Sequence, residues 1–300
     1  MSELLFPFYH QKVLHLSAAL EKKTSKISGE YIITEKYDGW WACTDYKTGL
    51  GFSRFHSSSG RVIPAFDWMI PYLNEWARVY ALPASCRLIG EMTLPDTPFH
   101  TLNGRFNRKT EQCEDAIFMV HDLLDMSSGI QGLTSPAITR MKIAEEVIQR
   151  SKCKVMQMVP RLDISSKQSV WERHFQQVTD EGGEGIVLKS CLGHYLNGKQ
   201  TEALMKLKTE CTADLLCIGI EESYGKKGEP SMNLQLQRKN GTTISVVVPK
   251  DSDRLNFKSS PTSVLGKVCT IIAMRELENG MYREPRFHHI RHDKLVSEID

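Results

Sequence analysis

Hydrophobic positions follow a mixture of helical and strand spacing over residues 1–209. Apolar residues three or four positions apart predict helices, because they fall on one face of a helix. Short apolar runs bounded by polar or glycine residues predict strands. The helices predicted in this way cover 13–20, 135–150 and 169–179, and the strands cover 31–34, 185–189 and 203–208.

Residues 210–300 show strand spacing almost throughout. Asn240-Gly241 separates two of the apolar runs and is a strong hairpin signal, because tight two-residue turns need positive φ angles. About 90 residues of this kind suit a small five-stranded barrel. We therefore expect a mixed α and β domain over 1–209 and an all-β domain over 210–300. The predicted strands of the second domain cover 213–220, 233–239, 242–248 and 267–274.

The composition is that of a globular protein large enough for two domains. The chain has 300 residues and a mass of 34.1 kDa, with 41% hydrophobic and 25% charged residues. No apolar run is long enough to span a bilayer and no signal peptide is evident, so we expect a cytoplasmic protein. The eight cysteines lack a C-x-x-C pair, which favours free thiols. A net charge of +2 leaves nucleic-acid binding open.

Candidate chemistry begins at Lys36, which follows a predicted strand and precedes Asp38 and Gly39. A lysine can act as a nucleophile only in its uncharged form. Alone, this pattern more often marks a surface lysine in a turn. Further short motifs follow it in order: Ser53-Arg54, Leu88-Ile-Gly90-Glu91, Met119-Val-His121-Asp122, Glu184-Gly-Ile-Val-Leu-Lys189 and Leu204-Met-Lys206-Leu-Lys208.

The spacing of the two lysines in the last motif predicts that they lie on the same face of a strand. Strand alternation places Lys206 and Lys208 on one face, with Met205 and Leu207 on the other. Two cations fixed side by side would stabilise charge on a phosphate during phosphoryl transfer. The alternative is a half-exposed strand whose lysines are only solvated.

The order and spacing of these motifs resemble those of the ATP-dependent DNA ligases, which share a superfamily with RNA ligases and mRNA capping enzymes. The resemblance implies an α+β fold, with an adenylylation (nucleotidyltransferase, ATP-grasp-like) domain over 1–209 and an OB-fold barrel over 210–300. The compact layout is similar to ligases of bacteriophages and other viruses. A monomer is implied, located in the cytoplasm, or in the host cytoplasm for a viral protein.

The resemblance also implies roles for individual residues. Lys36 would attack the α-phosphorus of ATP and become adenylylated, and Asp38 would help to hold the lysine and the nick ends. Lys206 and Lys208 would act on the phosphates. The implied cofactors are ATP and Mg²⁺, with Glu91 and Glu184 near the metal. The nucleotide-binding set is Glu35, Lys36, Arg54, Glu91, His121, Glu184, Lys189, Lys206, Lys208 and Arg291.

The implied partner is nicked duplex DNA with a 5′-phosphate and a 3′-hydroxyl. Besides Arg54, two basic stretches suit contact with the phosphate backbone: a loop at 103–109 with an aromatic residue inside it, and the C-terminal stretch 282–294. For the loop, a merely solvated segment is the alternative. The residues expected to contact nucleic acid are Arg54, Arg105, Arg108, Lys109, Arg283 and Arg286, and Arg291, Asp293 and Lys294 would close over ATP.

Two positions depart from the family pattern. Trp41 stands where ligases commonly carry an arginine, five residues after the lysine, and His121 stands where the family places an aromatic ring against adenine. A neutral imidazole can stack, but it can equally be a satisfied core residue. Two other readings therefore stay open: an RNA ligase of the same superfamily, and a nucleic-acid-binding module without catalytic activity.

Overall fold

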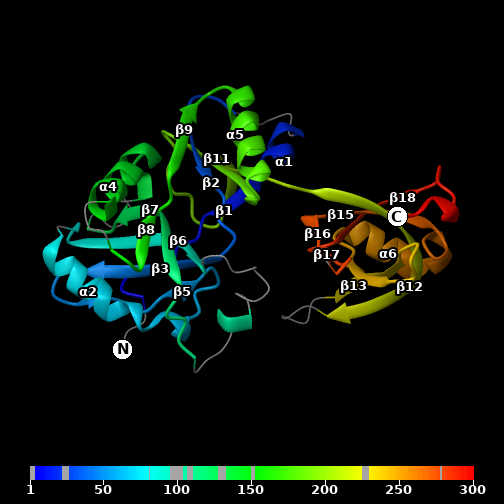
Figure 1. The fold of residues 1–300 in the computed structure, drawn as a ribbon, viewed down its shortest axis with the longest axis horizontal. Coiled ribbons are helices and arrows are strands. Elements are labelled where there is room, and N and C mark those ends of the chain that lie inside the picture. Colours follow the sequence, from blue (N-terminus) through cyan, green and yellow to red (C-terminus); the bar gives the residue numbers. More distant parts are fainter. Residues whose placement is uncertain are drawn as a thin grey trace. The chain divides into compact units, whose positions relative to one another are not determined.

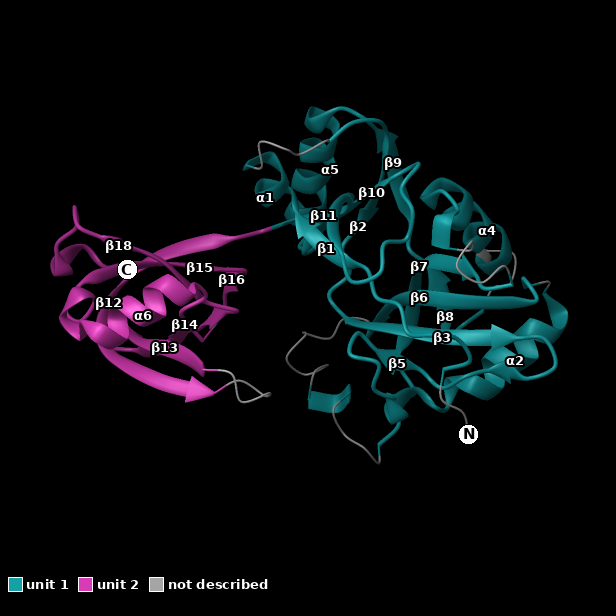
Figure 2. Ribbon diagram, turned by 180° about the vertical axis from the view of Figure 1, so that it is seen from behind, with its two compact units in different colours: residues 1–208 teal, residues 209–300 magenta. Residues whose placement is uncertain are grey.

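The computed structural model describes residues 4–21, 27–80, 82–94, 104–106, 111–127, 133–149, 153–224, 230–277 and 279–300. It divides into two compact units, Met1–Lys208 and Thr209–Asp300, which are coloured separately in Figure 2. Within the described residues, no helix is both long and apolar enough to cross a membrane.

A six-stranded sheet forms one half of the first unit. Successive side chains along its strands point to opposite faces, and each face packs into its own hydrophobic core. Ala42 and Leu88 face one side, and Cys43 and Ile89 face the other. The first side is covered by α2 (Met69–Val79) and α4 (Ala137–Gln149), as Figure 1 shows. The strand order is β4 (Gly51–Phe52), β3 (Trp40–Lys47), β6 (Ser85–Thr93), β7 (Ile117–Asp125) and β8 (Met156–Met158), with β5 (His56–Ser57) paired to β3.

A five-stranded sheet forms the other half. One face packs against α1 (Leu16–Glu21) and α5 (Gln168–Asp180), which lie side by side in Figures 1 and 2. Ile33, Leu188 and Met205 point into that core. The strand order is β1 (Lys12–His15), β11 (Gln200–Lys208), β10 (Gly185–Ser190), β2 (Tyr31–Glu35) and β9 (Arg161–Ser165).

The segment from Lys36 to Gly39 connects the two sheets, because β2 ends at Glu35 and β3 begins at Trp40. Gly39 fits this crossing for a steric reason. A Cβ atom at this position would lie 2.4 Å from the backbone oxygen of Met92 in β6, so any larger residue would push the start of β3 away from β6.

The second unit is a closed five-stranded barrel, as expected. The predicted hairpin is present: β13 pairs antiparallel with β14, and Gly241 in the turn has a φ of 85°. The barrel order is β12 (Cys211–Tyr224), β13 (Pro230–Gln237), β14 (Thr243–Val247), β18 (Arg286–Arg291) and β15 (Val268–Ala273). The unit also contains α6 (Asp251–Ser259), β16 (Arg275–Glu276), β17 (Tyr282–Arg283) and short 3₁₀ turns at Pro261–Ser263 and Val296–Glu298. A further 3₁₀ turn, Pro64–Phe66, lies in the first unit.

The predicted helix over 13–20 is wrong in its first half, where the chain forms β1 and becomes helical only at Leu16. Leu14 is opposite Met205 in the pairing of β1 with β11, so strand pairing overrides helical spacing there. The sequence analysis also missed α2 and α6. Pro71 lies near the start of α2, and a proline inside an apolar pattern is usually taken to end a helix. Here it lies in the first turn, where proline is tolerated. In α6 only Phe257 is buried, so periodicity carries little signal.

The N-terminal segment 4–11 covers the second side of the six-stranded sheet and is fixed by a buried ion pair. Arg87 Nε and Nη2 donate to the two carboxylate oxygens of Asp45 at 2.6 and 2.9 Å, and both side chains are fully buried. Arg87 also donates to the carbonyl oxygens of Phe6 and Pro7. Asp45 accepts from the backbone N–H groups of Leu5 and Phe6. One ion pair thus fastens the start of the chain to the sheet.

We predict that Arg87→Met destabilises the first unit by about 3–5 kcal/mol, because it leaves the Asp45 carboxylate buried without its partner. Urea unfolding followed by tryptophan fluorescence measures this directly, since all five tryptophans lie in the first unit. Arg105→Met is the matched control: it breaks the Arg105–Asp115 pair, which is solvent-exposed, and should cost less than about 1 kcal/mol. Equal losses in the two variants would contradict the prediction.

Candidate active site

A cavity of about 270 Å³ in the first unit is lined by residues from both sheets. It brings together six of the residues that the sequence analysis singled out: Glu35, Lys36, Glu91, His121, Lys189 and Lys206. The other residues of its wall are His10, Gln11, Val13, Thr34, Tyr37, Trp41, Ser58, Asp122, Val159, Val187, Tyr195 and Leu204.

Lys36 lies at the end of β2, where the sheet fixes its backbone. Its backbone N–H donates to the carbonyl oxygen of Gly185 at 2.8 Å. Its Nζ donates to Glu184 Oε2 at 2.5 Å, with the two side chains 22% and 8% exposed. The candidate nucleophile is therefore held beside a nearly buried carboxylate, that of Glu184, which directly precedes β10.

Glu91 supplies a second carboxyl group, from β6 opposite Trp41. Burial raises its pKa to about 8, the charges of Glu184 and Asp38 act in the same direction, and Lys36 opposes them. Its buried Oε2 has no hydrogen-bond partner among the described residues. At neutral pH the group is largely protonated, so it can both donate and accept a hydrogen bond.

Asp122, Arg140 and Lys189 form a buried charged cluster behind the cavity. Arg140 Nε and Nη2 donate to the Asp122 carboxylate at 2.8 and 3.0 Å, and Lys189 Nζ donates to it at 2.9 Å. Lys189 also donates to the carbonyl oxygen of His121 at 2.6 Å. The cations hold the pKa of Asp122 below its usual value, although burial acts against them. Lys189 is thus tethered, and much of its charge is offset.

His121 presents a neutral ring to the cavity. Burial, and to a lesser extent Lys189, lowers its pKa to about 3. His121, which departs from the family pattern, therefore lies in the cavity wall. Its neutral ring can stack without adding charge.

The two lysines of the last motif do not share a location. Lys206 is opposite Val187 and lines the cavity, whereas Lys208 lies opposite Gly185 and is not part of the lining. Met205 points to the helical core as expected, and its side chain is fully buried. Asp38 also lies outside the lining.

Several residues expected to contact substrate lie elsewhere. Arg54 makes a two-pronged ion pair with Asp67 and lines a different cavity, of about 870 Å³, with Asn74 and Arg78. Arg105 is paired with Asp115. Arg108 and Lys109 lie outside the described residues.

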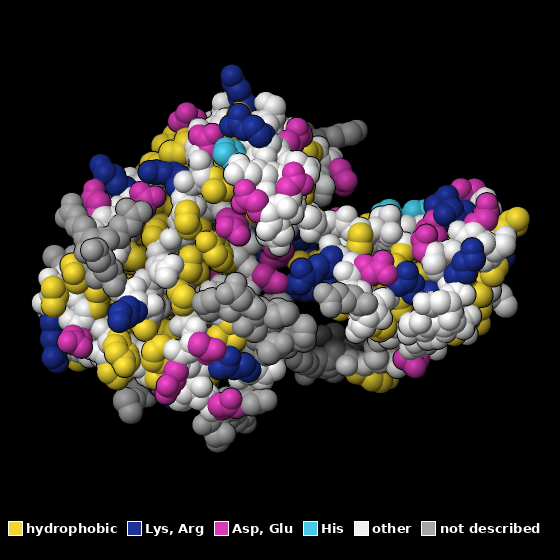
Figure 3. Space-filling model, viewed as in Figure 1, with side chains coloured by type: hydrophobic (Ala, Val, Ile, Leu, Met, Phe, Trp, Pro, Cys, Tyr) yellow, Lys and Arg dark blue, Asp and Glu magenta, His cyan; other side chains and the backbone are white. Residues whose placement is uncertain are grey.

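Two of the arginines expected to contact substrate in the second unit are also paired. Arg286 forms an ion pair with Glu210, and Arg291 pairs with Asp293 and with Asp214. Arg283 lies in β17. On the face seen in Figure 3, basic and acidic side chains are interspersed over both units, in keeping with the small net charge.

Three residues of the site were missed from the sequence. Arg140 lies on the buried face of α4, between Ala137 and Ala144. Because buried charged residues are nearly always paired, a charged residue on an apolar helix face indicates a buried ion pair. His10 and Gln11 precede the first motif by more than two dozen residues and carry no motif of their own. Only the tertiary fold brings them to the cavity.

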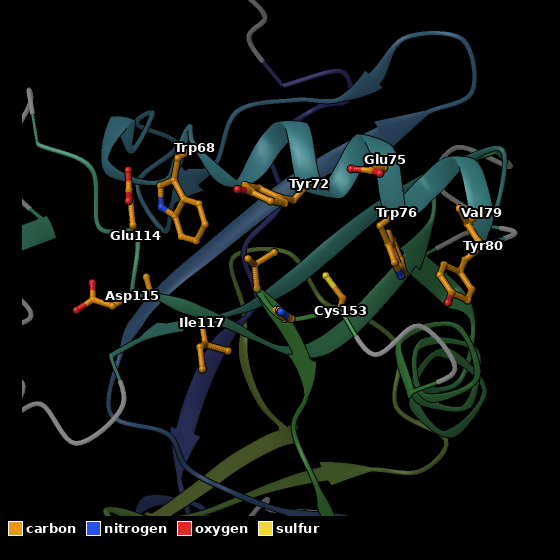
Figure 4. Close-up of a pocket in the computed structure, with 13 residues that line it drawn as sticks. Trp68, Tyr72, Glu75, Trp76, Val79, Tyr80, Glu114, Asp115, Ile117 and Cys153 are labelled. Carbon is orange, nitrogen blue, oxygen red and sulfur yellow. The ribbon is translucent and has the colours of Figure 1, made fainter.

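A third cavity, of about 570 Å³, lies beside α2. Figure 4 shows Trp68, Tyr72, Trp76 and Tyr80 along the helix and at its two ends, forming an aromatic wall. Its polar lining consists largely of acidic side chains, including Glu75 and Glu114, and none of the predicted site residues reaches it. An acidic rim opposes a phosphate ligand, so the smaller cavity at Lys36 is the better candidate for nucleotide chemistry.

Comparison with known proteins agrees with this geometry. Residues 13–208 match the family model of the ATP dependent DNA ligase domain. The chain belongs to the ATP-dependent DNA ligase domain family. This match includes β2, Lys36, Glu184 and β11, and it covers every residue of the cavity lining except His10 and Gln11.

Among relatives, the DNA ligase of Methanocorpusculum labreanum is 28% identical over 232 residues, which cover 68% of this chain and 41% of the relative. A probable DNA ligase of Rhodococcus opacus is 29% identical over 168 residues, covering 53% of this chain and 31% of the relative. The chain thus spans less than half the length of these curated relatives.

Solved structures show the same fold over both units. The chain named Pmar-Lig_PreS3 has a TM-score of 0.77 and 21% identity, over 95% of this chain and 68% of that one. A chain from a study of DNA binding by Lig E DNA ligases has a TM-score of 0.71 and 18% identity, over 95% of this chain and all of that one. The α+β ligase architecture, an adenylylation domain followed by an OB-fold barrel, is therefore present.

The raised pKa of Glu91 has a consequence for stability. A carboxyl group whose pKa is about 8 in the folded state and near 4.5 in the unfolded state favours folding fully below pH 4.5, and this contribution is lost as pH rises towards 8. Glu91→Gln removes the titration, so it should stabilise the protein at pH 9 relative to wild type by about 1–3 kcal/mol more than at pH 5.

Urea midpoints at pH 5 and pH 9 test this, with Glu172→Gln on the exposed face of α5 as the control. A pH-independent effect of Glu91→Gln would show that burial does not hold the proton on this carboxyl group.

Proposed function

We propose that this protein is an ATP-dependent DNA ligase that seals nicks between a 5′-phosphate and a 3′-hydroxyl in duplex DNA through an AMP adduct on Lys36. The observation that carries the proposal is the meeting of Lys36, Glu91 and Lys206 in the lining of one cavity, with Glu184 paired to Lys36, in a chain of this family. These residues supply an amine nucleophile, two carboxyl groups and a cation for the phosphate oxygens.

The first step is transfer of AMP to Lys36. The Nζ atom forms a bond to the α-phosphorus of ATP, and the bond from that phosphorus to the leaving pyrophosphate breaks. The ammonium must first lose a proton, and Glu184 Oε2, at 2.5 Å, is in reach to take it. Lys206 faces the same cavity and stabilises charge on the phosphate oxygens.

The tethered cluster of Asp122, Arg140 and Lys189 has a positioning role in this scheme. Its internal hydrogen bonds hold the Lys189 ammonium and the His121 backbone in fixed places along the cavity. A preorganised cation needs little rearrangement when phosphate arrives. We assign the stacking of the adenine ring to the neutral His121 side chain, and nucleotide contact to Glu35 beside it.

Mg²⁺ fits the donor set of the site. The described residues contain no cluster of three or more His, Cys, Asp or Glu side chains that could hold a metal alone. Mg²⁺ commonly takes only one or two carboxylates together with substrate phosphates and water. Glu184 would hold it together with Glu91, whose Oε2 is unpartnered within the described structure. On binding the ion, Glu91 would lose the proton that burial keeps on its carboxyl group at neutral pH. When bound, the ion neutralises charge on the phosphates.

In the remaining steps AMP passes from Lys36 to the 5′-phosphate of the nick, and the 3′-hydroxyl then displaces AMP to form the phosphodiester bond. We assign contact with the nick to Asp38 and Arg54, and contact with the nucleotide phosphates to Lys208. Contact with the DNA backbone is assigned to Arg105, Arg108, Lys109, Arg283 and Arg286. We assign closure over ATP to Arg291. Because such contacts are mainly to phosphates, binding weakens as salt rises. A cytoplasmic monomer is part of this proposal.

The test is the intact mass of the protein after incubation with ATP and Mg²⁺. We predict one AMP adduct on the wild type, none on Lys36→Ala, and an undiminished adduct on Lys47→Ala, a control at the exposed end of β3. Absence of the adduct on pyrophosphate-free wild-type protein would contradict the proposal and favour a silent binding module.

Strand preference requires a second assay. We expect the adenylylated protein to seal a nick with a deoxyribose 3′-end faster than the same nick with a ribose 3′-end. A preference for an RNA 3′-strand would contradict the assignment to DNA and leave the adenylylation step standing.

A further inference from the structure

The N-terminal segment forms one wall of the cavity at Lys36, although it lies far from the ligase motifs in sequence. His10 and Gln11 both belong to the lining. The backbone N–H of His10 donates to Asn197 Oδ1 at 2.9 Å, and that of Gln11 donates to the Tyr195 hydroxyl at 3.1 Å. Gly198 donates back to the His10 carbonyl oxygen at 2.8 Å. The two side chains are therefore presented to the cavity by a firmly anchored backbone.

Gln11 is a polar residue of the cavity wall whose position is fixed through the backbone. It is only 5% exposed, and its backbone N–H, not its side chain, makes the hydrogen bond to the Tyr195 hydroxyl. Because Gln11 lines the cavity, its side-chain amide can pair with a molecule that enters it.

His10, the neighbour of Gln11 in the chain, lies among aromatic rings. The His10 ring lies edge-on to Trp41, with the ring centroids 4.7 Å apart, and Phe8 packs on Trp41 at 6.2 Å. Burial, aided by Lys12, lowers the pKa of His10, so its imidazole is neutral at physiological pH. Trp41, where the family commonly has an arginine, thus supports a wall suited to a flat, uncharged ring.

We propose that Gln11 reads the edge of the nucleobase, its amide accepting a hydrogen bond from the 6-amino group of adenine and donating one to an adjacent ring nitrogen. An amide offers one acceptor and a donor side by side, which matches this pair of groups on adenine. Gln11 is thereby a specificity-determining residue, and the His10–Trp41 pair holds the wall on which it is carried. This inference rests on the proposed function, because it assumes that ATP occupies the cavity.

The experiment measures AMP-adduct formation against nucleotide concentration, using ATP and purine riboside triphosphate, which lacks the 6-amino group. Wild type should use ATP with a kcat/KM about tenfold or more above that for the analogue. Gln11→Met keeps the size and flexibility of the side chain without its amide. It should lower kcat/KM for ATP about tenfold, mainly through KM, and bring the ratio between the two nucleotides close to one.

Gln177→Met, on an exposed position of α5, is the matched control and should change neither constant. Gln11→Glu keeps the acceptor and loses the donor, so it should retain part of the discrimination. The comparison of the two nucleotides on wild type needs no variant, and therefore tests the proposal even where a substitution at Gln11 impairs folding.

Equal use of the two nucleotides by wild type, or full discrimination by Gln11→Met, would overturn the role of Gln11 while the adduct itself upholds the proposed function. Absence of any adduct on wild type would overturn the proposed function and this inference with it. A lowered kcat with an unchanged KM and ratio in Gln11→Met would indicate a purely structural residue, which also overturns the proposal.

Discussion

The candidate site depends on the pairing of β10 with β2 on one side and with β11 on the other. Val187 is opposite Thr34 and Lys206, and this register places Lys36, Glu184 and Lys206 around one point. A shift of one residue in either pairing would turn Lys206 and Lys189 towards the helical core and Met205 and Leu188 towards the cavity. The burial of Ile186, Leu188 and Met205 against α1 and α5 therefore fixes the chemistry on the opposite face.

The site also draws on a segment that the motifs do not include. The chain before β1 is held by the Asp45–Arg87 pair at one end and by Tyr195 and Asn197 at the other. Between these anchors it lays His10 and Gln11 on the cavity wall. A family motif marks the residues that react, whereas this wall is specified by buried hydrogen bonds scattered over the first unit.

This explains which features could be predicted from the sequence. Strand alternation is a local property, so the two faces of β11 and the hairpin at Asn240-Gly241 were predicted correctly. The helix predicted over 13–20 failed because pairing with β11 is a long-range effect. The roles of the cavity residues remain predictions. The placement of Gln11 and the pairing of Arg54 with Asp67 depend on the tertiary fold. Local sequence patterns therefore could not predict them.

The treatment of buried polar groups separates structural from functional positions. The carboxylates of Asp45 and Asp122 are buried and fully partnered, by Arg87 and by Arg140 with Lys189. At the cavity the pattern changes: Glu91 Oε2 is buried without a partner within the described structure, and the Gln11 amide belongs to the same lining. The other buried side-chain atoms without a partner among the described residues are the uncharged Nε1 groups of Trp68 and Trp76, so Glu91 is the carboxyl group among them. Glu91 and Gln11 can both offer hydrogen-bonding groups to a molecule in the cavity. Their hydrogen-bonding capacity is what a ligand carrying both donors and acceptors would complete, and a nucleotide, with a ribose at one end of its base and an amino group at the other, is such a ligand.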